Sequence, residues 1–214
     1  MMDATNQLPP RRTYHHGDLR QALLEAGIAL ARSGGPEAVV LREATRRVGV
    51  VPNAAYRHFV NRHALLQAVR AAALSALAQA MEKKLIRQRR GKLREDAARA
   101  SLRAIGTAYL RFARTEPGLF RTAFGEPGDP ETTTHPEISD KSGLNPFQLL
   151  GTALDELVQT GLLPAERRPG AEYLAWSAVH GLAMLVLEGP LRRLPRAQVR
   201  RIEQRLLIMV EQGL

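Results

Sequence analysis

The sequence predicts an all-α protein of about nine helices. Apolar residues recur three and four positions apart over most of its 214 residues, which is the spacing of one helix face. No segment shows the convincing alternation of apolar and polar residues that a half-buried strand would give. Turn signals such as Gly34-Gly35 and Pro117-Gly118 separate the periodic segments. A chain of this length can form one or two domains with a hydrophobic core.

The composition narrows the class of protein. There is no cysteine, which rules out a disulfide framework and a thiolate metal site. The first residues lack the apolar core of a signal peptide, and the longest uncharged apolar run, residues 173–187, is shorter than the roughly 20 residues that span a bilayer. We therefore expect a cytoplasmic protein with no membrane contact. The formal charge of +10 suggests a polyanionic partner, but the first 63 residues and the remainder are both basic, so charge does not locate the site.

An N-terminal arm is expected before the first helix. Residues 1–13 contain two successive prolines and two successive arginines, which suits an arm reaching a DNA groove and equally suits a solvated terminus. The first helix should begin near Asp18, because Asp18 and Gln21 have the spacing of a capping box. Gly34-Gly35 should end it.

The stretch 41–60 has the pattern of a helix-turn-helix, which is two short helices around a glycine turn. The helix Arg42–Val48 would end at Gly49, which can adopt a positive φ at little steric cost. Pro52 suits the first position of a helix, and the second helical piece is expected from Asn53 to Phe59. Small or apolar residues that can pack the two helices together are Ala44, Val48, Val50 and Ala55. The second helix of such a motif enters the major groove of DNA.

The outward residues of this motif are the expected DNA contacts. Cationic side chains that can pair with phosphates are Arg42, Arg46, Arg47, Arg57 and Arg62. Tyr56 and His58 add donors at the end of the second helix. Base readout would fall on Asn53, because an asparagine amide can bond adenine through both of its polar atoms. The residues expected to assist Asn53 are Pro52, Ala54 and Arg57.

The middle of the chain predicts a helical body. A fourth helix would open at Asn61, a good N-cap, and run to about Arg89. The seven basic residues between Lys83 and Arg94 are interpreted as a solvated helix end, with a second nucleic-acid patch as the alternative. The next helices are expected at about 93–115, at 117–124 and from Asn145-Pro146 to near Gly161. Residues 125–145 would be either a mobile connection or a lid.

Two apolar helices should complete the body. The segment from about Pro169 to Gly189 is apolar almost all round, which predicts burial from more than one direction. The segment from about Pro195 to Gln212 has one apolar stripe and a charged opposite face. The stripe consists of Val199, Ile202, Leu206, Met209 and Val210, and the opposite face of Arg196, Arg200, Arg201, Glu203 and Arg205. Together these two helices hold more apolar surface than a lone hairpin can cover.

The sequence contains no recognisable catalytic or metal motif. It lacks a nucleophile elbow, a phosphate-binding loop, a zinc-protease motif and a dinucleotide fingerprint. The neighbours Tyr14, His15, His16 and Asp18 could suggest a metal cluster, but adjacent histidines rarely chelate without further ligands. We expect no enzyme activity, no cofactor and no bound metal.

The N-terminal residues resemble the DNA-binding domain of the tetracycline-repressor (TetR) family over about fifty positions. The resemblance lies in His16-Gly17-Asp18-Leu19-Arg20, Gly49, Tyr56-Arg57-His58-Phe59 and Ala64-Leu65-Leu66, with Arg62 where the family usually has lysine. The family usually has alanine at Thr45, and serine or threonine at Val51, the N-cap of the recognition helix. Losing a capping hydroxyl costs about 0.5–2 kcal/mol.

The C-terminal residues are similar to one subgroup of these regulators, often called WHG. The resemblance lies in Trp176, His180 and Gly181 and in the stretch Pro117-Gly118-Leu119-Phe120. It implies a DNA-binding domain over 1–63 and a ligand-binding and dimerisation domain over 64–214. It also implies a homodimer through the last two helices that reads a palindromic operator, and a repressor released by a small-molecule effector.

The effector is expected to be apolar and to lie among aromatic side chains of the body. The candidate lining residues are Tyr109, Phe112, Phe120, Phe124, Phe147, Trp176 and His180. The alternative is that these residues form ordinary core, with His180 bonded to the backbone. The alternative function is a basic, weakly specific DNA-binding protein or a helical partner-binding protein whose base readout is degraded.

Overall fold

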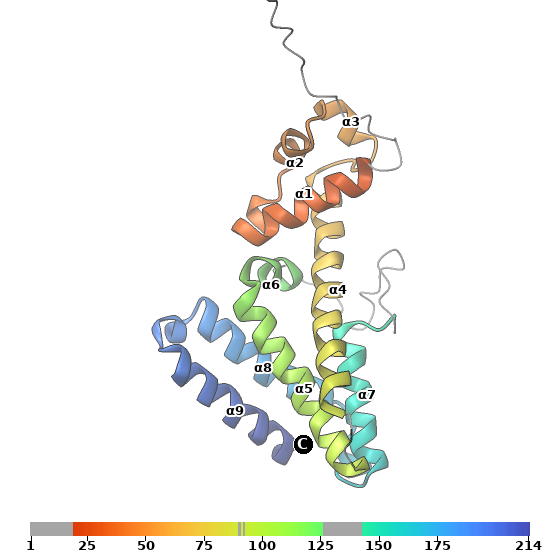
Figure 1. Ribbon diagram of the computed structural model, residues 1–214, viewed down its shortest axis with the longest axis vertical. Coiled ribbons are helices and arrows are strands. Elements are labelled where there is room, and N and C mark those ends of the chain that lie inside the picture. The colour runs from red at the N-terminus through yellow and green to blue at the C-terminus, as the bar shows by residue number, and fades with distance from the viewer. Residues whose placement is uncertain (1–18, 90, 92, 126–142) are drawn as a thin grey trace, which may run out of the picture.

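The computed structural model of the chain describes residues 19–89, 91, 93–125 and 143–214. Over these residues it consists of α-helices joined by turns and short 3₁₀ segments, with no strand (Figure 1). The helices are α1 (Leu19–Gly34), α2 (Leu41–Val48), α3 (Pro52–Tyr56), α4 (Arg62–Arg89), α5 (Arg94–Thr115), α6 (Pro117–Phe124), α7 (Pro146–Gln159), α8 (Ala171–Leu187) and α9 (Arg196–Gly213). The 3₁₀ segments are η1 (Pro36–Ala38), η3 (Ala165–Arg167) and η4 (Pro190–Arg193). The predicted all-α class and the number of helices are confirmed for this part of the chain.

Some predicted features lie outside the described residues. They are the arm at 1–13, the polar cluster of Tyr14, His15, His16 and Asp18, Arg90 and Lys92 of the basic run, and residues 126–142 of the predicted connection.

The long helix α4 joins the two ends of the molecule (Figure 1). We call α1–α3 the head and α5–α9 the body. α4 leaves the head and runs down the length of the body, where α5 returns antiparallel to it, and α6 lies directly beneath α1. The Nε of Arg70 on α4 donates a 3.1 Å hydrogen bond to the carbonyl of Ala123 on α6. α4 and α6 thus contact each other, and both also contact α1 of the head.

Local chain chemistry explains most of the head. α2 ends at Gly49, whose φ of 77° is left-handed and whose N–H bonds the carbonyls of Thr45 and Arg46. α3 begins at Pro52, as predicted. Ala44 and Ala55 are completely buried where α2 and α3 meet, which confirms their predicted packing role.

The second helix of the motif is shorter than predicted. α3 ends at Tyr56 rather than Phe59. In the turn that follows, the carbonyl of Ala55 accepts the N–H groups of both His58 and Phe59 at 2.9 Å. The turn brings the ring of Phe59 into the core, with the guanidinium of Arg20 5.5 Å from the ring centre. The helix thus ends where the chain turns to place Phe59 in the core.

α4 begins as predicted at Asn61, whose Oδ1 accepts the N–H of Ala64 at 2.8 Å. By length and composition alone this helix could cross a membrane. Its side chains Leu65, Val69 and Leu77 are completely buried against other helices, so its apolar character is that of a core helix. α7 is also capped as predicted, by a reciprocal pair of 2.9 Å hydrogen bonds between Asn145 and Gln148.

The predicted burial of α8 from more than one direction is confirmed, because α5, α7 and α9 pack against it, but part of the apolar surface of α8 and α9 stays exposed. α8 leaves Leu174 65% and Leu185 44% exposed, because α5, α7 and α9 cover only its other sides. On α9, Met209 of the predicted stripe is 59% exposed. Glu203 of the predicted charged face is instead turned inward, where it pairs with Arg114 on α5. The single chain therefore leaves an apolar surface on this side of the body.

Candidate functional site

The outer side of α3 is the first candidate site. Pro52, Asn53, Tyr56 and Arg57 are exposed, whereas Ala54 and His58 are partly buried. Val51 precedes the helix and provides no side-chain cap, so the capping hydroxyl that the resemblance would supply is absent here. The helix is anchored from below by Ala55 and presents a short polar surface outward.

The arginines around α3 divide into engaged and available groups. Arg46 and Arg47 pair with Glu43 on α2 at 2.7 and 3.4 Å. The hydrogen bond from Arg46 is the main reason that the pKa of Glu43 is lowered to about 2. Arg42 and Arg57 are exposed and make no ion pair with any residue that the structure describes. These two are therefore the head cations most available to a phosphate.

Arg62 has a structural role that the sequence did not reveal. Its Nε donates to the carbonyl of Val39 at 2.8 Å and its Nη2 to that of Pro36 at 2.6 Å. These bonds hold the start of α4 against η1 and the connection to α2. A DNA contact by Arg62 stays a prediction, and it would have to use the remaining guanidinium nitrogen.

The second candidate site is a cavity inside the body. The centres of water-sized molecules can occupy about 80 Å³ of it, and all the space between its atoms, including space open to solvent, is about 860 Å³. The predicted residues Tyr109, Phe124, Phe147 and Trp176 line it. The other lining residues are Arg70, Leu74, Met81, Leu102, Arg103, Ile105, Gly106, Ala123, Asn145, Pro146, Leu150, Ala175, Val179, Leu207 and Val210. Helices α4 to α9 all contribute to its walls.

Three predicted lining residues lie outside this cavity. The α5 wall ends at Tyr109, so Phe112, nearly one turn nearer the head, is buried beyond it. Phe120 is completely buried behind the wall, and the ring of His180 stacks on it with centres 5.7 Å apart. These positions follow from how α6 and α8 pack, which helical spacing alone does not give.

Tyr109, Trp176 and His180 form one hydrogen-bonded group. Tyr109 and Trp176 belong to the cavity wall, and His180 lies outside the lining. The Trp176 Nε1–H donates to the Tyr109 hydroxyl at 3.1 Å, and that hydroxyl lies 2.7 Å from His180 Nδ1. Burial raises the pKa of Tyr109 and lowers the pKa of His180, so both groups are neutral at neutral pH. The hydroxyl accepts the Trp176 N–H, and its own proton has Nδ1 as its acceptor within hydrogen-bond distance. We therefore assign the tyrosine O–H as the donor to Nδ1, which leaves the proton of the neutral imidazole on Nε2. His180 is thus a partner of the tyrosine hydroxyl rather than of the backbone.

Tyr109→Phe should destabilise the protein by about 1–3 kcal/mol, because it leaves the Trp176 N–H and the His180 Nδ1 without their partner. Urea unfolding followed by circular dichroism would measure the loss. Tyr56→Phe is the control, because Tyr56 is exposed on α3 and its change should stay within about 0.5 kcal/mol. Equal stabilities of the two variants would contradict this role of the hydroxyl.

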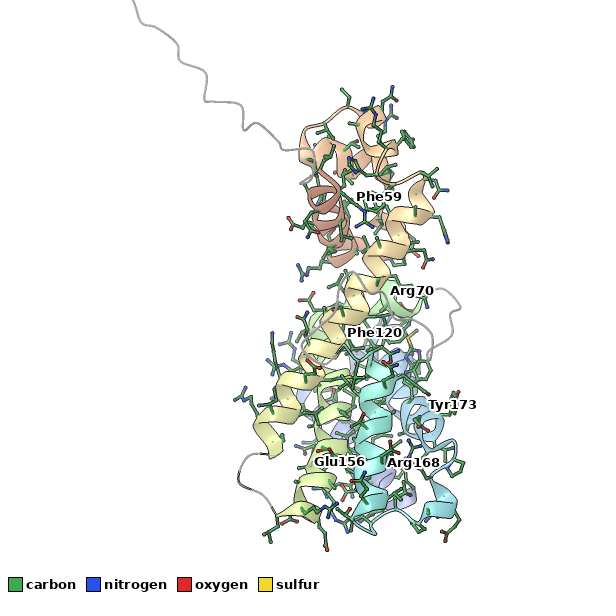
Figure 2. All side chains as sticks on the ribbon, turned by 90° about the vertical axis from the view of Figure 1, so that its right-hand side faces the viewer. Phe59, Arg70, Phe120, Glu156, Arg168 and Tyr173 are labelled. Atoms are coloured by element: carbon green, nitrogen blue, oxygen red, sulfur yellow. The ribbon has the colours of Figure 1, made fainter. Side chains whose placement is uncertain are left out.

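Arg70 is the polar lining residue that sequence analysis most clearly missed. Figure 2 shows it on α4 where that helix passes from the head to the body. A signal was present, because Arg70 is the only charged residue between Ala64 and Met81. Arg103 also lines the cavity, but its guanidinium is held by the carboxylate of Glu211, which Arg99 also contacts at 3.1 Å.

Within the described residues, no group of three or more histidine, cysteine, aspartate or glutamate side chains is placed to hold a metal ion. The two candidate sites are therefore an exposed recognition helix and a mostly apolar cavity, joined by α4.

Comparison with known proteins agrees with this arrangement. The model of the bacterial regulatory proteins of the tetR family matches residues 23–69, and the model of the tetracyclin repressor-like C-terminal domain matches residues 102–209. No curated protein matches the chain. A protein of unknown function from Rhodococcus sp. RHA1 is similar in structure, with 25% sequence identity and a TM-score of 0.72 over 95% of this chain and 99% of that one.

Two further solved structures share the fold at lower identity. The transcriptional regulator FadR from Bacillus subtilis, in complex with stearoyl-CoA, has 13% identity and a TM-score of 0.64 over 91% of this chain and 98% of that one. A bacterial regulatory protein of the tetR family from Rhodococcus RHA1 has 17% identity and a TM-score of 0.54 over 90% and 96%. Since the C-terminal model alone matches half of the chain, and the N-terminal model covers the helix-turn-helix, the chain belongs to the TetR family of DNA-binding transcriptional regulators.

Proposed function

We propose that the protein is a homodimeric repressor that binds a palindromic operator and leaves it when a small molecule occupies the body cavity. The observation that supports this most directly is the course of α4. Its first turns carry Leu65 and Leu66 in the core beside the head, and its later turns carry Leu74 and Met81 in the cavity wall. One rigid element thus connects the two candidate sites.

The surface of α3 suits readout of the major groove. Asn53 is exposed at the start of the helix, where side chains of a recognition helix reach base edges. Arg42 and Arg57 can pair with phosphates and set the register, which gives affinity without sequence preference. In this proposal the DNA-binding domain comprises residues 1–63, and the ligand-binding and dimerisation domain comprises residues 64–214.

Release of the operator requires a ligand that prefers one arrangement of the heads. α6 is suited to transmit the effect of a bound ligand to the head, because it contacts both. Ala123 and Phe124 line the cavity, and Glu116 at the start of α6 pairs with Arg32 of α1 at 3.1 Å. Ordinary coupling would make the effector bind the DNA-free form more tightly by about 1–3 kcal/mol. The FadR structure supports a ligand-binding role for this fold, since it holds stearoyl-CoA.

Selection of bound duplexes from a random library would test the proposal, because such a selection finds the preferred sequence directly. We expect a palindrome whose half-sites are about 34–36 Å apart, bound at least about 10³-fold more tightly than a scrambled duplex at physiological salt. Recovery of no preferred sequence would overturn specific regulation. It would favour the second candidate, a weakly specific DNA binder, which the uncapped five-residue α3 keeps open.

Asn53→Ala should relax discrimination at one base pair per half-site by about 1–3 kcal/mol. Fluorescence anisotropy with the selected operator and with single-base variants would measure this. Arg42→Gln is the comparison, because Arg42 is exposed and is expected to contact phosphate alone, so its loss should weaken binding to all duplexes alike and reduce the salt dependence. A uniform loss for Asn53→Ala would instead make Asn53 a phosphate or structural residue.

A further inference from the structure

Arg70 is a cation whose charge no residue that the structure describes neutralises. A guanidinium has five N–H donors, and the structure accounts for one, the 3.1 Å bond from Nε to the carbonyl of Ala123. No carboxylate among the described residues pairs with it, although its side chain is partly buried at the wall of the cavity. A partly buried charge is costly unless a counter-charge approaches it.

Among the residues that the structure describes, the cavity offers no such counter-charge. None of the described residues that line it is an aspartate or a glutamate. Its other cation, Arg103, is already neutralised by Glu211, whose side chain is only 4% exposed. The first turn of α7 also lines the cavity, at Asn145, Pro146 and Phe147, and the N-terminal end of a helix favours negative charge. The polar groups of the cavity thus favour an anion.

The rest of the cavity is long and apolar. Its lining on α4 runs from Arg70 to Met81, which is about 16 Å at a rise of 1.5 Å per residue. Because α5 runs antiparallel to α4, Tyr109 lies toward the Arg70 end and Leu102 toward the Met81 end. Aromatic rings therefore surround the region near the charge, and aliphatic side chains line the far end.

We propose that the cavity takes an amphipathic anion, with its carboxylate or phosphate group held by Arg70 and its apolar chain lying along α4 toward Met81. This rests on the proposed function only in placing the effector in the same cavity. It replaces the apolar effector expected from the sequence. Arg70 is suited to the role because its remaining donors form a planar fork that matches both carboxylate and phosphate oxygens.

The position of Arg70 also connects such a ligand to α6. The same guanidinium bonds the carbonyl of Ala123, so an anion on Arg70 would lie beside the contact between α4 and α6. Figure 2 places Arg70 just above Phe120 of α6 in the molecule. An uncharged ligand in the same cavity would make no such contact.

Trp176 provides a direct measure of occupancy, because it is the only tryptophan of the chain and lines the cavity. Its fluorescence would be titrated in the full-length protein at neutral pH with three probes of equal chain length: decanoate, decyl phosphate and 1-decanol. We expect at least one of the anions to bind about 10- to 100-fold more tightly than the alcohol. The ranking of decanoate and decyl phosphate distinguishes a carboxylate site from a phosphate site.

Variants of Arg70 then test the residue itself. Arg70→Met should remove the preference for the anions while the affinity for 1-decanol stays within a few-fold, and Arg70→Lys should retain part of the preference. Arg111→Gln is the matched control, because Arg111 is an exposed arginine of α5 outside the cavity lining, and it should keep the full preference.

Three results would overturn the anion site. They are equal affinities for the anions and the alcohol, a preference that survives Arg70→Met, and no response of Trp176 to any probe. Operator binding, measured separately by anisotropy with and without each probe, distinguishes failure of the proposed release mechanism from failure of the anion site. Anions that bind through Arg70 without changing operator affinity support the site and contradict the release mechanism. Release by 1-decanol as effective as release by the anions would support the mechanism and overturn the anion site.

Discussion

A protein carrying Leu174→Glu and Leu185→Glu is expected to sediment as a 23.6 kDa monomer, and we expect the unaltered chain to sediment as a dimer at micromolar concentration. The two leucines lie on one face of α8, together with exposed Ser177 and Gly181, at helical spacing. A Cβ at Gly181 would meet nothing within 4 Å, so a second helix could approach closely there. Glutamates in a twofold contact through this face would be buried without partners.

The same double variant should lose most of its affinity for the operator. A dimer binds the second half-site as an intramolecular event, and that advantage is worth about 10²- to 10⁴-fold. Both positions are already exposed in the single chain, so its circular dichroism spectrum and the environment of Trp176 should be unchanged. Anisotropy on the selected operator, combined with sedimentation velocity, would measure both effects.

Ile86→Glu is the matched control for this surface. Ile86 is 71% exposed near the C-terminal end of α4, a different helix from the one that carries Leu174 and Leu185. This variant should remain dimeric and bind the operator normally. An unaltered chain that is monomeric at micromolar concentration, or a double variant that stays dimeric, would contradict dimerisation through this face.

α8 also illustrates why the sequence predicts some features and not others. An apolar helix has the same composition whether its own chain or a second copy covers it. The sequence therefore predicted excess apolar surface on the last two helices, but not which residues, such as Leu174, the single chain leaves exposed. Features determined by neighbours in the chain were predicted correctly. Gly49 ends α2, Pro52 begins α3 and Asn61 caps α4, because each depends on φ, on a missing N–H or on a nearby hydroxyl or amide.

In the cavity, too, some features could be predicted from the sequence and others depend on how the helices pack. Its aromatic character was predictable, and Tyr109, Phe124, Phe147 and Trp176 line it. Which ring of an aromatic cluster faces the cavity depends on the rotation of each helix against its neighbours, so His180 and Phe120 could not be separated from Trp176 by spacing. Arg70 was missed for a different reason. Its apolar surroundings were interpreted as packing, and a single charge within an apolar stretch was not treated as a binding group.

Gly118→Ala is expected to destabilise the protein more than any other glycine-to-alanine substitution in the body. Gly118 lies in the first turn of α6, against the C-terminal end of α1, and a Cβ there would lie 2.6 Å from the carbonyl oxygen of Arg32 and still closer to that of Ala31. Both obstacles are backbone atoms, so no change of rotamer relieves the overlap and α6 must move away from α1. Overpacking of this kind costs about 1–3 kcal/mol and occasionally more.

Gly106→Ala is the appropriate comparison, because it makes the same chemical change within a helix of the same body. A Cβ at Gly106 would overlap the Cδ2 of Leu207, which is the end of a flexible side chain and can turn aside. The gain in helix propensity, about 1 kcal/mol, is similar for both variants and cancels in the comparison. Urea unfolding should therefore place Gly118→Ala below Gly106→Ala by about 2 kcal/mol, and equal stabilities would show that α6 can shift freely. Gly118 is where α6 approaches α1 of the head closely, so Gly118→Ala should also change operator affinity in protein that remains folded. Gly106→Ala changes a residue of the cavity wall and should leave operator affinity unchanged in the absence of ligand.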